Sequence, residues 1–231
     1  MHGTTIVAVH RYGVSALAGD GQVSLGDTIV KRGAVKVRTL ADGAVLAGFA
    51  GAVSDAFTLL DKFEGHLAAS RNNLLKAAVE TVKEWRTDRM LRNLEAMLVV
   101  ADASQILSLS GHGDVIAPDA AVAPDAAIAS DATVAPDATV AAVAPDATVA
   151  AVGSGGAYAQ AAALALLRAT DLPAEAIARR ALAIAGEIDV FTSGSGTVLT
   201  VGGGTRRNGV DDQAGGDATE REAGDGAEGE A

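Results

Sequence analysis

Two short runs of the sequence, Ile6 to Val9 and Val45 to Ala50, contain only apolar residues and one glycine. A strand with one face in water alternates apolar and polar residues, whereas a strand covered on both faces is apolar throughout. We therefore predict two buried strands, with helices packed outside the sheets that contain them. The first run lies in a predicted hairpin of residues 4–11 and 13–19, which turns around Tyr12-Gly13.

The other predicted helices and strands suit two sheets between two helical layers. Helical spacing of apolar residues predicts four helices, and short apolar runs predict the remaining strands. The predicted strands are residues 27–31, 34–39, 44–49, 95–103, 105–110, 190–192 and 197–201, and the predicted helices are residues 54–67, 73–93, 156–169 and 173–186. The order is strands, two helices, strands, two helices and strands, which we interpret as an α+β fold.

Thr4 stands at the head of the first predicted strand, after three residues that we expect to be a short propeptide. If the chain is cut between Gly3 and Thr4, Thr4 carries both a hydroxyl nucleophile and a free α-amino group. The reference pKa of an α-amino group is about 7.7 to 8.0, so near neutral pH part of it is unprotonated and accepts the hydroxyl proton. The alternative is that Thr4 and Thr5 only begin a β-strand, as threonine commonly does.

Several motifs follow Thr4 in a fixed order. They are Ala18-Gly19-Asp20-Gly21-Gln22, Val35-Lys36-Val37-Arg38, Ala47-Gly48-Phe49-Ala50-Gly51, Asp55-Ala56-Phe57-Thr58-Leu59, Glu84-Trp85-Arg86-Thr87-Asp88-Arg89 and Gly153-Ser154-Gly155-Gly156. In this order and spacing the sequence resembles the HslV family, the proteasome-related N-terminal threonine peptidases that work with the ring ATPase HslU. The resemblance covers residues 4–114 and 153–192. It implies a four-layer α-β-β-α sandwich of the N-terminal nucleophile hydrolase type.

The resemblance also assigns candidate catalytic residues around Thr4. Lys36 occupies the position of the family's catalytic lysine, and Asp20 that of the carboxylate which keeps the lysine charged and oriented. A lysine ammonium disfavours a second positive charge on the α-amino group of Thr4. We expect the backbone N–H of Gly48 to bind the developing oxyanion, because glycine has no side chain to obstruct the approach. Ser154 matches the family's serine beside the site.

A monovalent cation and two kinds of protein partner are further implications of the resemblance. The family binds the cation, here expected to be Na⁺, through backbone carbonyls at positions that correspond to Gly186, Asp189 and Thr192. Asp189 departs from the usual residue, but carbonyl ligation does not depend on the side chain. The peptide chemistry itself needs no cofactor. The implied assembly is a homo-oligomer of two stacked hexameric rings, which receives unfolded protein substrates from an HslU-type AAA+ ATPase ring that uses ATP.

The segment Ala117 to Val152 departs from the family pattern. It repeats Val-Ala-Pro-Asp-Ala-Thr with small variations and contains four of the five prolines. We interpret it as a low-complexity insert that forms a mobile loop, because proline and aspartate disfavour both helix and sheet. A small β-helix built from the hexapeptides is the alternative. Residues 202–231 are expected to be a disordered acidic tail, so residues 4–201 form the predicted catalytic domain, with the insert inside it.

The composition excludes several classes of function. The chain has no cysteine, which removes disulfides and thiol catalysis. Its net charge of −11 comes mostly from the insert and the tail, which carry −5 each, and the rest of the chain offers no basic stripe for nucleic acid. No apolar run reaches the roughly 18 residues of a membrane span, and the first residues lack the pattern of an export signal. We therefore expect a cytoplasmic protein without nucleic-acid or membrane partners.

Together these observations predict an ATP-dependent threonine endopeptidase subunit that degrades unfolded proteins inside a ring-shaped chamber. Two alternatives remain open. A proteasome β-type subunit with a different ATPase partner would differ in ring size. A catalytically inactive scaffold that presents the acidic repeat would never expose the amino group of Thr4.

Overall fold

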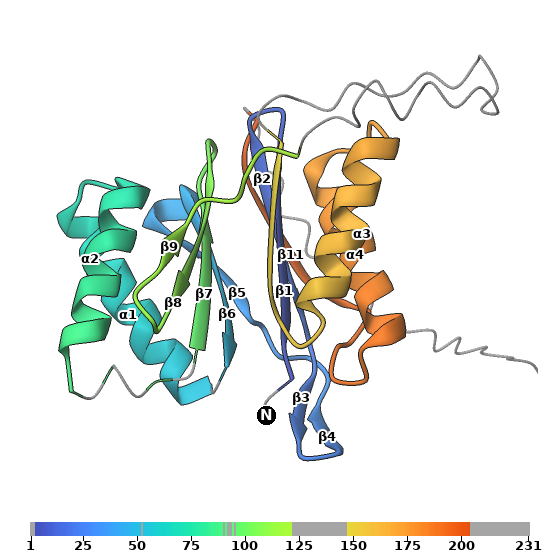
Figure 1. The fold of residues 1–231 in the computed structure, drawn as a ribbon, viewed down its shortest axis with the longest axis horizontal. Helices are drawn as coiled ribbons and strands as arrows, with labels where there is room; N and C mark the ends of the chain where they lie inside the picture. The colour runs from blue at the N-terminus through green and yellow to red at the C-terminus, as the bar shows by residue number, and fades with distance from the viewer. Residues whose placement is uncertain are drawn as a thin grey trace, which may run out of the picture.

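The structure, a computed structural model, describes residues 3–51, 53–89, 91, 94, 96–121 and 147–203. Two antiparallel sheets face each other, and each carries a pair of helices on its outer side, so the domain has four layers (Figure 1). The predicted α-β-β-α sandwich is confirmed. The expectations for residues 1–2, for the insert between residues 122 and 146, and for the tail from residue 204 fall outside the described residues.

The first sheet contains the strand that begins beside Thr4. Its strands are β1 (Thr5–Arg11), β2 (Val14–Asp20), β10 (Thr148–Gly153) and β11 (Gly196–Gly202), in the order β10-β1-β2-β11. Tyr12 and Gly13 join β1 to β2, and both have positive φ, as tight hairpin turns of this twist require. All seven residues of β1 are buried. The uninterrupted apolar run therefore does mark a strand covered on both faces.

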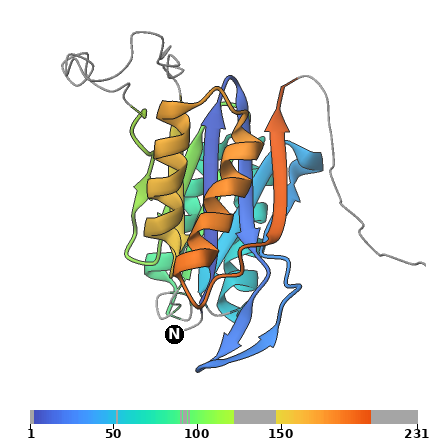
Figure 2. The same cartoon turned by 90° about the vertical axis from the view of Figure 1, so that its right-hand side faces the viewer.

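The second sheet lies opposite the first. Its strands are β5 (Val37–Leu40), β6 (Val45–Gly51), β7 (Ala96–Ala101), β8 (Ile106–Ser110) and β9 (Val115–Ile116), and they pair in chain order. A single 3₁₀ turn, Ala41–Gly43, connects β5 to β6. The strands β3 (Val23–Leu25) and β4 (Thr28–Lys31) form a separate ribbon that projects beyond the sandwich at the end where β1 begins (Figure 2).

Four helices cover the outer faces of the sheets. Helices α1 (Val53–Ala69) and α2 (Leu74–Thr87) pack on the second sheet, and helices α3 (Gly156–Ala169) and α4 (Ala174–Ile188) pack on the first (Figure 1). Helix α2 was predicted to reach residue 93, but it ends at Thr87 because the backbone of Asp88 is extended. Among the helices that the structure describes, none combines the length and the apolar character needed to cross a membrane.

The strand β1 contributes alternately to two buried clusters, one on each side of the first sheet. Val7 and Val9 face α3 and α4, whereas Ile6 and Ala8 face the second sheet. Two glycines let the sheets approach closely at this point. A Cβ added to Gly19 or to Gly48 would lie 2.9 Å from a methyl group of Ile6. Glycine at position 48 is therefore required by the packing of the two sheets.

The boundary predicted for the insert is wrong at its C-terminal side. Residues 148–152, assigned to the insert from their composition, belong to β10 and pair with β1 from Thr148↔His10 to Gly153↔Thr5. Their Ala- and Val-rich sequence resembles the preceding repeats, so composition could not separate them. The two ends of the insert lie side by side, because the Ala121 N–H donates to the Ala147 carbonyl at 2.6 Å.

The strand predicted at residues 190–192 is also wrong. After α4 the chain makes a turn at Thr192, whose N–H donates to the carbonyl of Asp189 at 3.0 Å. The last strand begins only at Gly196. The intervening loop, residues 189–195, instead wraps around the start of β1.

Candidate active site

Thr4 lies directly before β1 and is only 5% exposed. Its carbonyl accepts a hydrogen bond from the N–H of Ser154 at 2.9 Å, next to the paired residues Thr5 and Gly153. Gly153 has a φ of +95°, and a Cβ at this position would lie 1.8 Å from the Thr4 carbonyl oxygen. Both the backbone conformation and the lack of space require glycine here. The backbone of Thr4 is thus fixed by β10 and by the turn that leads into α3.

Asp20, the last residue of β2, is fully buried beside the start of β1. Its Oδ1 accepts from the N–H of Thr5 at 2.7 Å and from Nζ of Lys36 at 2.8 Å. Its Oδ2 accepts from the N–H groups of Gln22, at 2.8 Å, and of Ser193, at 3.4 Å. The carboxylate therefore joins the start of β1, the ammonium of Lys36 and the loop that contains Ser193.

Lys36 precedes β5 and is 5% exposed. Its Nζ binds Asp20 and also donates to the carbonyl of Gln22 at 2.5 Å. Burial lowers the pKa of Lys36 from its ordinary value of 10.5, while the charge of Asp20 and the hydrogen bond to it act in the opposite direction. Lys36 and Thr4 line the same cavity. The structure therefore brings Thr4, Lys36 and Asp20 close together, and their catalytic roles stay predictions.

A carboxylate on the other side of Thr4, that of Asp189, organises the hydroxyl groups around it. Oδ2 of Asp189 accepts from Oγ of Ser154 at 2.7 Å and from Oγ1 of Thr192 at 2.5 Å. Oγ1 of Thr5 lies 2.6 Å from Oγ1 of Thr192 and accepts from the N–H of Gly155 at 2.9 Å. Because Thr192 gives its proton to Asp189, Thr5 donates to Thr192. This network joins β1, the start of α3 and the loop after α4.

The sequence predicted a role for the backbone of Asp189 and Thr192 but missed the role of their side chains. Oδ1 of Asp189 accepts from the N–H of Phe191 at 3.2 Å, the local hydrogen bond of an Asx turn. The signal in the sequence for such a turn was an aspartate, Asp189, that directly follows an apolar helix. Its partner Ser154 is 35 residues away in the chain, so the signal could not name it.

Gly48 lies in β6, opposite Val37 and one residue before Phe49, whose N–H donates to the carbonyl of Lys36 at 3.3 Å. This places Gly48 beside Lys36. The lack of a side chain serves the packing against Ile6 and Leu17 rather than access for a ligand, because the missing Cβ points between the sheets. A role of the Gly48 N–H toward an oxyanion remains a prediction.

A cavity of about 350 Å³ opens beside Thr4 and Lys36. Most of its other lining residues are apolar or small, and they come from the ribbon, from the segment before β5, from β6 and from α1. These residues are Gly3, Gln22, Val23, Ser24, Lys31, Ala34, Val35, Phe49, Gly51 and Phe57. A pocket of this kind suits an apolar side chain of a bound polypeptide.

The three residues predicted to bind a cation lie at the end of α4 and in the loop after it. A Cβ at Gly186 would lie 2.3 Å from the N of Gly194, so the loop folds back onto the helix end. Carbonyl groups at a helix C-terminus carry partial negative charge, which favours a cation. The Asp189 carbonyl already accepts from Thr192, but a carbonyl has a second lone pair. The residues therefore fit a monovalent cation held by carbonyl oxygens.

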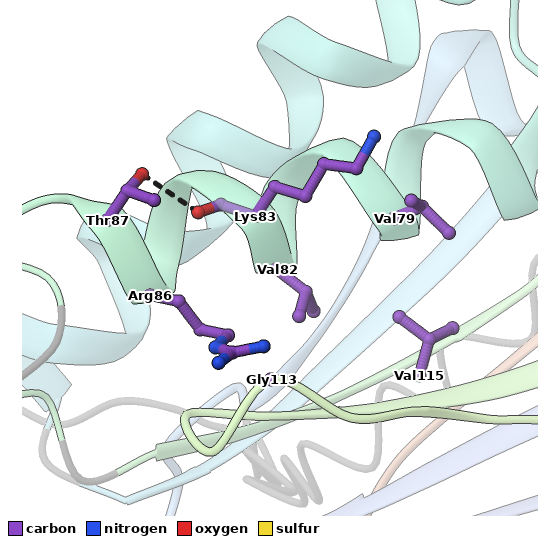
Figure 3. A pocket seen from close by; sticks show the side chains of 7 residues that line it. All are labelled: Val79, Val82, Lys83, Arg86, Thr87, Gly113 and Val115. Atoms are coloured by element: carbon purple, nitrogen blue, oxygen red, sulfur yellow. Dashed lines mark hydrogen bonds between the residues drawn. The ribbon is translucent and has the colours of Figure 1, made fainter.

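A second cavity, of about 450 Å³, lies between α2 and the turn that contains Gly113 (Figure 3). Its lining combines valines with the cationic side chains of Lys83 and Arg86. The one hydroxyl in the lining, Oγ1 of Thr87, donates to the carbonyl of Lys83 at 2.9 Å. Among the residues that line this cavity, none is a general base paired with that hydroxyl.

The sequence and the structure were compared with known proteins. A family described as "Proteasome subunit" matches residues 1–127. The chain is 48% identical, over 192 residues, to the ATP-dependent protease subunit HslV of Petrotoga mobilis, a match that covers 83% of this chain and 93% of that protein. The crystal structure of HslV from Trypanosoma brucei superposes with a TM-score of 0.70 at 39% identity, covering 86% of this chain and 99% of that one.

A more distant structure shows the fold alone. The BPH protein of Thiobacillus denitrificans has a TM-score of 0.54 at 20% identity, with 85% of this chain and 95% of that chain covered. The two nearer matches each cover more than four fifths of this chain. The chain therefore belongs to the proteasome subunit family and, within it, to the HslV threonine peptidases.

Proposed function

We propose that the chain is the peptidase subunit of an ATP-dependent protease and that Thr4, freed by removal of residues 1–3, is its nucleophile. The observation that carries the proposal is the position of Thr4. Its carbonyl is bound by Ser154, and the next residue is bound by Asp20, which also holds the ammonium of Lys36. One backbone segment therefore fixes the nucleophile beside a positive charge, with a cavity of about 350 Å³ next to it.

In this proposal the α-amino group of Thr4 accepts the hydroxyl proton while Oγ1 attacks the carbonyl carbon of the scissile bond. The ammonium of Lys36 disfavours a second positive charge nearby. The amino group of Thr4 is therefore neutral at a lower pH than it would be without Lys36. The N–H of Gly48 stabilises the oxyanion. The leaving amine takes the proton, and an ester with Thr4 remains. Water then hydrolyses the ester and restores the hydroxyl.

Ser154 supports this reaction in two ways. Its N–H holds the Thr4 carbonyl at 2.9 Å, and its hydroxyl is oriented by the carboxylate of Asp189 at 2.7 Å. Once residues 1–3 are removed, Thr4 has a free amino group in place of the Gly3–Thr4 amide. The oriented hydroxyl of Ser154 is then available to hydrogen-bond with that amino group. A Na⁺ bound by the carbonyls of Gly186, Asp189 and Thr192 would rigidify the loop that carries Asp189. No step of the peptide chemistry requires the cation.

We further propose that copies of the chain form two stacked hexameric rings served by an HslU-type AAA+ ATPase in the cytoplasm. The relative from Petrotoga mobilis is an ATP-dependent protease subunit, which supports an ATPase partner. Large apolar side chains stay exposed at the end of the domain that holds Thr4, among them Val190 at 77%, Leu25 at 69% and Val30 at 59%. Contacts between copies would cover them. Unfolded polypeptides are then the substrates, since folded proteins cannot enter a closed chamber.

Replacement of Thr4 tests the proposal. Thr4→Ala should reduce hydrolysis of a short fluorogenic peptide on the order of 10³-fold or more, whereas Thr4→Ser should retain part of the activity because a hydroxyl remains. Thr28→Ala, which alters an exposed threonine of β4, is the matched control and should behave as the parent. Intact-mass measurement should show parent chains that begin at Thr4. Full activity of Thr4→Ala would contradict the assignment of the nucleophile.

A further inference from the structure

Gly3, the residue before Thr4, has no room for a side chain. It is buried, and a Cβ at this position would lie 2.1 Å from Cβ of Phe191 and 2.9 Å from the Phe191 carbonyl oxygen. The requirement comes from the close contact with Phe191.

Phe191 cannot move away, because its loop is anchored on both sides. Its N–H donates to Oδ1 of Asp189 at 3.2 Å. The next residue, Thr192, binds the hydroxyl of Thr5 at 2.6 Å, and the N–H of Ser193 donates to Asp20 at 3.4 Å. The atom nearest to the missing side chain of Gly3 is a Cβ, which moves only with the backbone. A side chain at residue 3 would therefore displace residue 3 itself.

Gly3 is also a wall of the cavity beside Thr4. The residue before the bond to be cut thus has Phe191 on one side and the substrate cavity on the other. We propose that Phe191 is a positioning residue for self-cleavage, which excludes every side chain at residue 3 and holds the Gly3 carbonyl in reach of the Thr4 hydroxyl. This inference rests on the proposed function, since self-cleavage is what exposes the amino group of Thr4.

The reaction that Phe191 supports has two steps. Oγ1 of Thr4 attacks the carbonyl carbon of Gly3, a C–O bond forms, the C–N bond to Thr4 breaks, and the hydroxyl proton passes to the leaving nitrogen. Water then hydrolyses the resulting ester. The products are residues 1–3 with a free carboxylate and a chain that starts with the free amine and hydroxyl of Thr4. Phe191 takes part in neither bond change and acts only through the position of Gly3.

A paired set of variants tests this role. The full chain is synthesised in a cell-free system, and intact mass follows the release of residues 1–3 with time. Gly3→Ala should slow the release at least about tenfold, because a 1 Å displacement costs on the order of 10²-fold in well-oriented reactions. Gly3→Ala combined with Phe191→Gly should release residues 1–3 at least several-fold faster than Gly3→Ala alone, since the obstructing Cβ is gone. Gly3→Ala combined with Phe191→Ala is the matched control and should not recover, because alanine keeps that Cβ.

Two outcomes would overturn the inference. One is release at the parent rate by Gly3→Ala, and the other is equal recovery in both double variants. A chain that begins Met-Thr4 tests the proposed function without self-cleavage. In an expression host the methionine before the small threonine is removed, so the amino group of Thr4 is exposed in any case. Phe191→Gly in that chain should hydrolyse peptides within a few-fold of its parent. If it does not, Phe191 belongs to the mature site and its assigned role is wrong, whereas an inactive Met-Thr4 parent would refute the proposed function instead.

Discussion

Lys36 and Asp20 form a buried ion pair in which Nζ and Oδ1 are 2.8 Å apart, with the two side chains 6% and 0% exposed. The pair links the segment before β5 to the end of β2, and Asp20 also binds the N–H of Thr5. Charge and backbone position are therefore set by the same carboxylate. A change at Asp20 must alter both, which makes it the most informative position for testing the mechanism.

Asp20→Asn should lower kcat for peptide hydrolysis on the order of 10²-fold and shift the alkaline limb of the pH profile. The pKa of Lys36 already lies below 10.5 because of burial, and Asp20 is what raises it against that effect. Activity that depends on the ammonium is present below this pKa and is lost as the pH rises through it. Without the charge of Asp20 the pKa falls further, so the loss should begin at a lower pH.

The measurement is kcat against pH for the parent, for Asp20→Asn and for Asp27→Asn, an exposed aspartate in the β3–β4 turn that serves as control. The Asp27→Asn profile should coincide with that of the parent. An alkaline limb that stays in place, or moves to higher pH, in Asp20→Asn would show that Lys36 is not the group that titrates.

Asp189→Ala should reduce kcat about 10- to 100-fold without preventing folding. The hydroxyls of Ser154 and Thr192 lose the carboxylate that both bind. The Ser154 hydroxyl, which we propose to act on the Thr4 amino group, is then no longer oriented. Ser154→Ala and the double variant should cost little more than Asp189→Ala, because residues that act as one unit are not additive. Peptide hydrolysis measures the effect, and the exposed neighbour Glu187→Ala is the control. Additive losses of kcat in the double variant would show that Asp189 and Ser154 act independently.

Replacing residues 122–146 by a two-residue Asn-Gly turn should leave the melting temperature within a few degrees of the parent and the ring size unchanged. The ends of this segment already meet, since Ala120 bridges Thr148 and Ala121 binds Ala147. Shortening a loop changes its closure free energy by only about 0.6 kcal/mol per halving. Differential scanning calorimetry and light scattering measure the two quantities.

A wider deletion, of residues 120–147, is the instructive comparison. It would also remove Ala121 and Ala147, which are buried at 6% and 0% exposure. It should therefore lower the melting temperature more than the narrower one. Equal melting temperatures of the two variants would mean that residues 120, 121 and 147 contribute nothing to stability. A large loss of stability or of ring assembly in the narrower variant would mean that the repeat packs against the domain.

Arg11→Ala should destabilise the domain by about 2–4 kcal/mol. Its side chain is fully buried, and Nη1 donates to the carbonyls of Thr170 and Leu172, at 2.7 and 3.0 Å, in the connection between α3 and α4. Alanine would leave both carbonyls without this donor. Urea unfolding followed by circular dichroism gives the value, with Arg179→Ala, at the exposed face of α4, as control. A change below 0.5 kcal/mol would contradict the role of Arg11 as a clamp on this connection.

The sequence predicted the parts of the fold that local patterns determine. Uninterrupted apolar runs located β1 and β6. The motif resemblance singled out Lys36 and Asp20, and the structure pairs these two residues at the start of β1. The contacts that it missed join distant positions. Thr5 and Thr192, whose hydroxyls touch, are 187 residues apart. No local propensity encodes such a pair, since it exists only after both sheets have assembled.

The error at β10 has a different physical origin. Thr148 to Gly153 have the same composition as the repeats before them, and only their pairing with β1 makes them a strand. The boundary of the insert is thus set by which residues reach a partner strand, and composition carries no information about that.

The glycines around Thr4 also limit how this site can be altered by laboratory evolution. Besides Gly3 and Gly153, Gly155 has no room for a Cβ, which would lie 2.5 Å from Oγ1 of Thr5 and 2.6 Å from Oγ1 of Thr192. Every codon change at these positions that replaces glycine adds atoms where none fit. A saturation library at Gly153 and Gly155, selected for activity, should return glycine alone, whereas libraries at Val23 and Val35 should yield many functional sequences with altered cleavage preference.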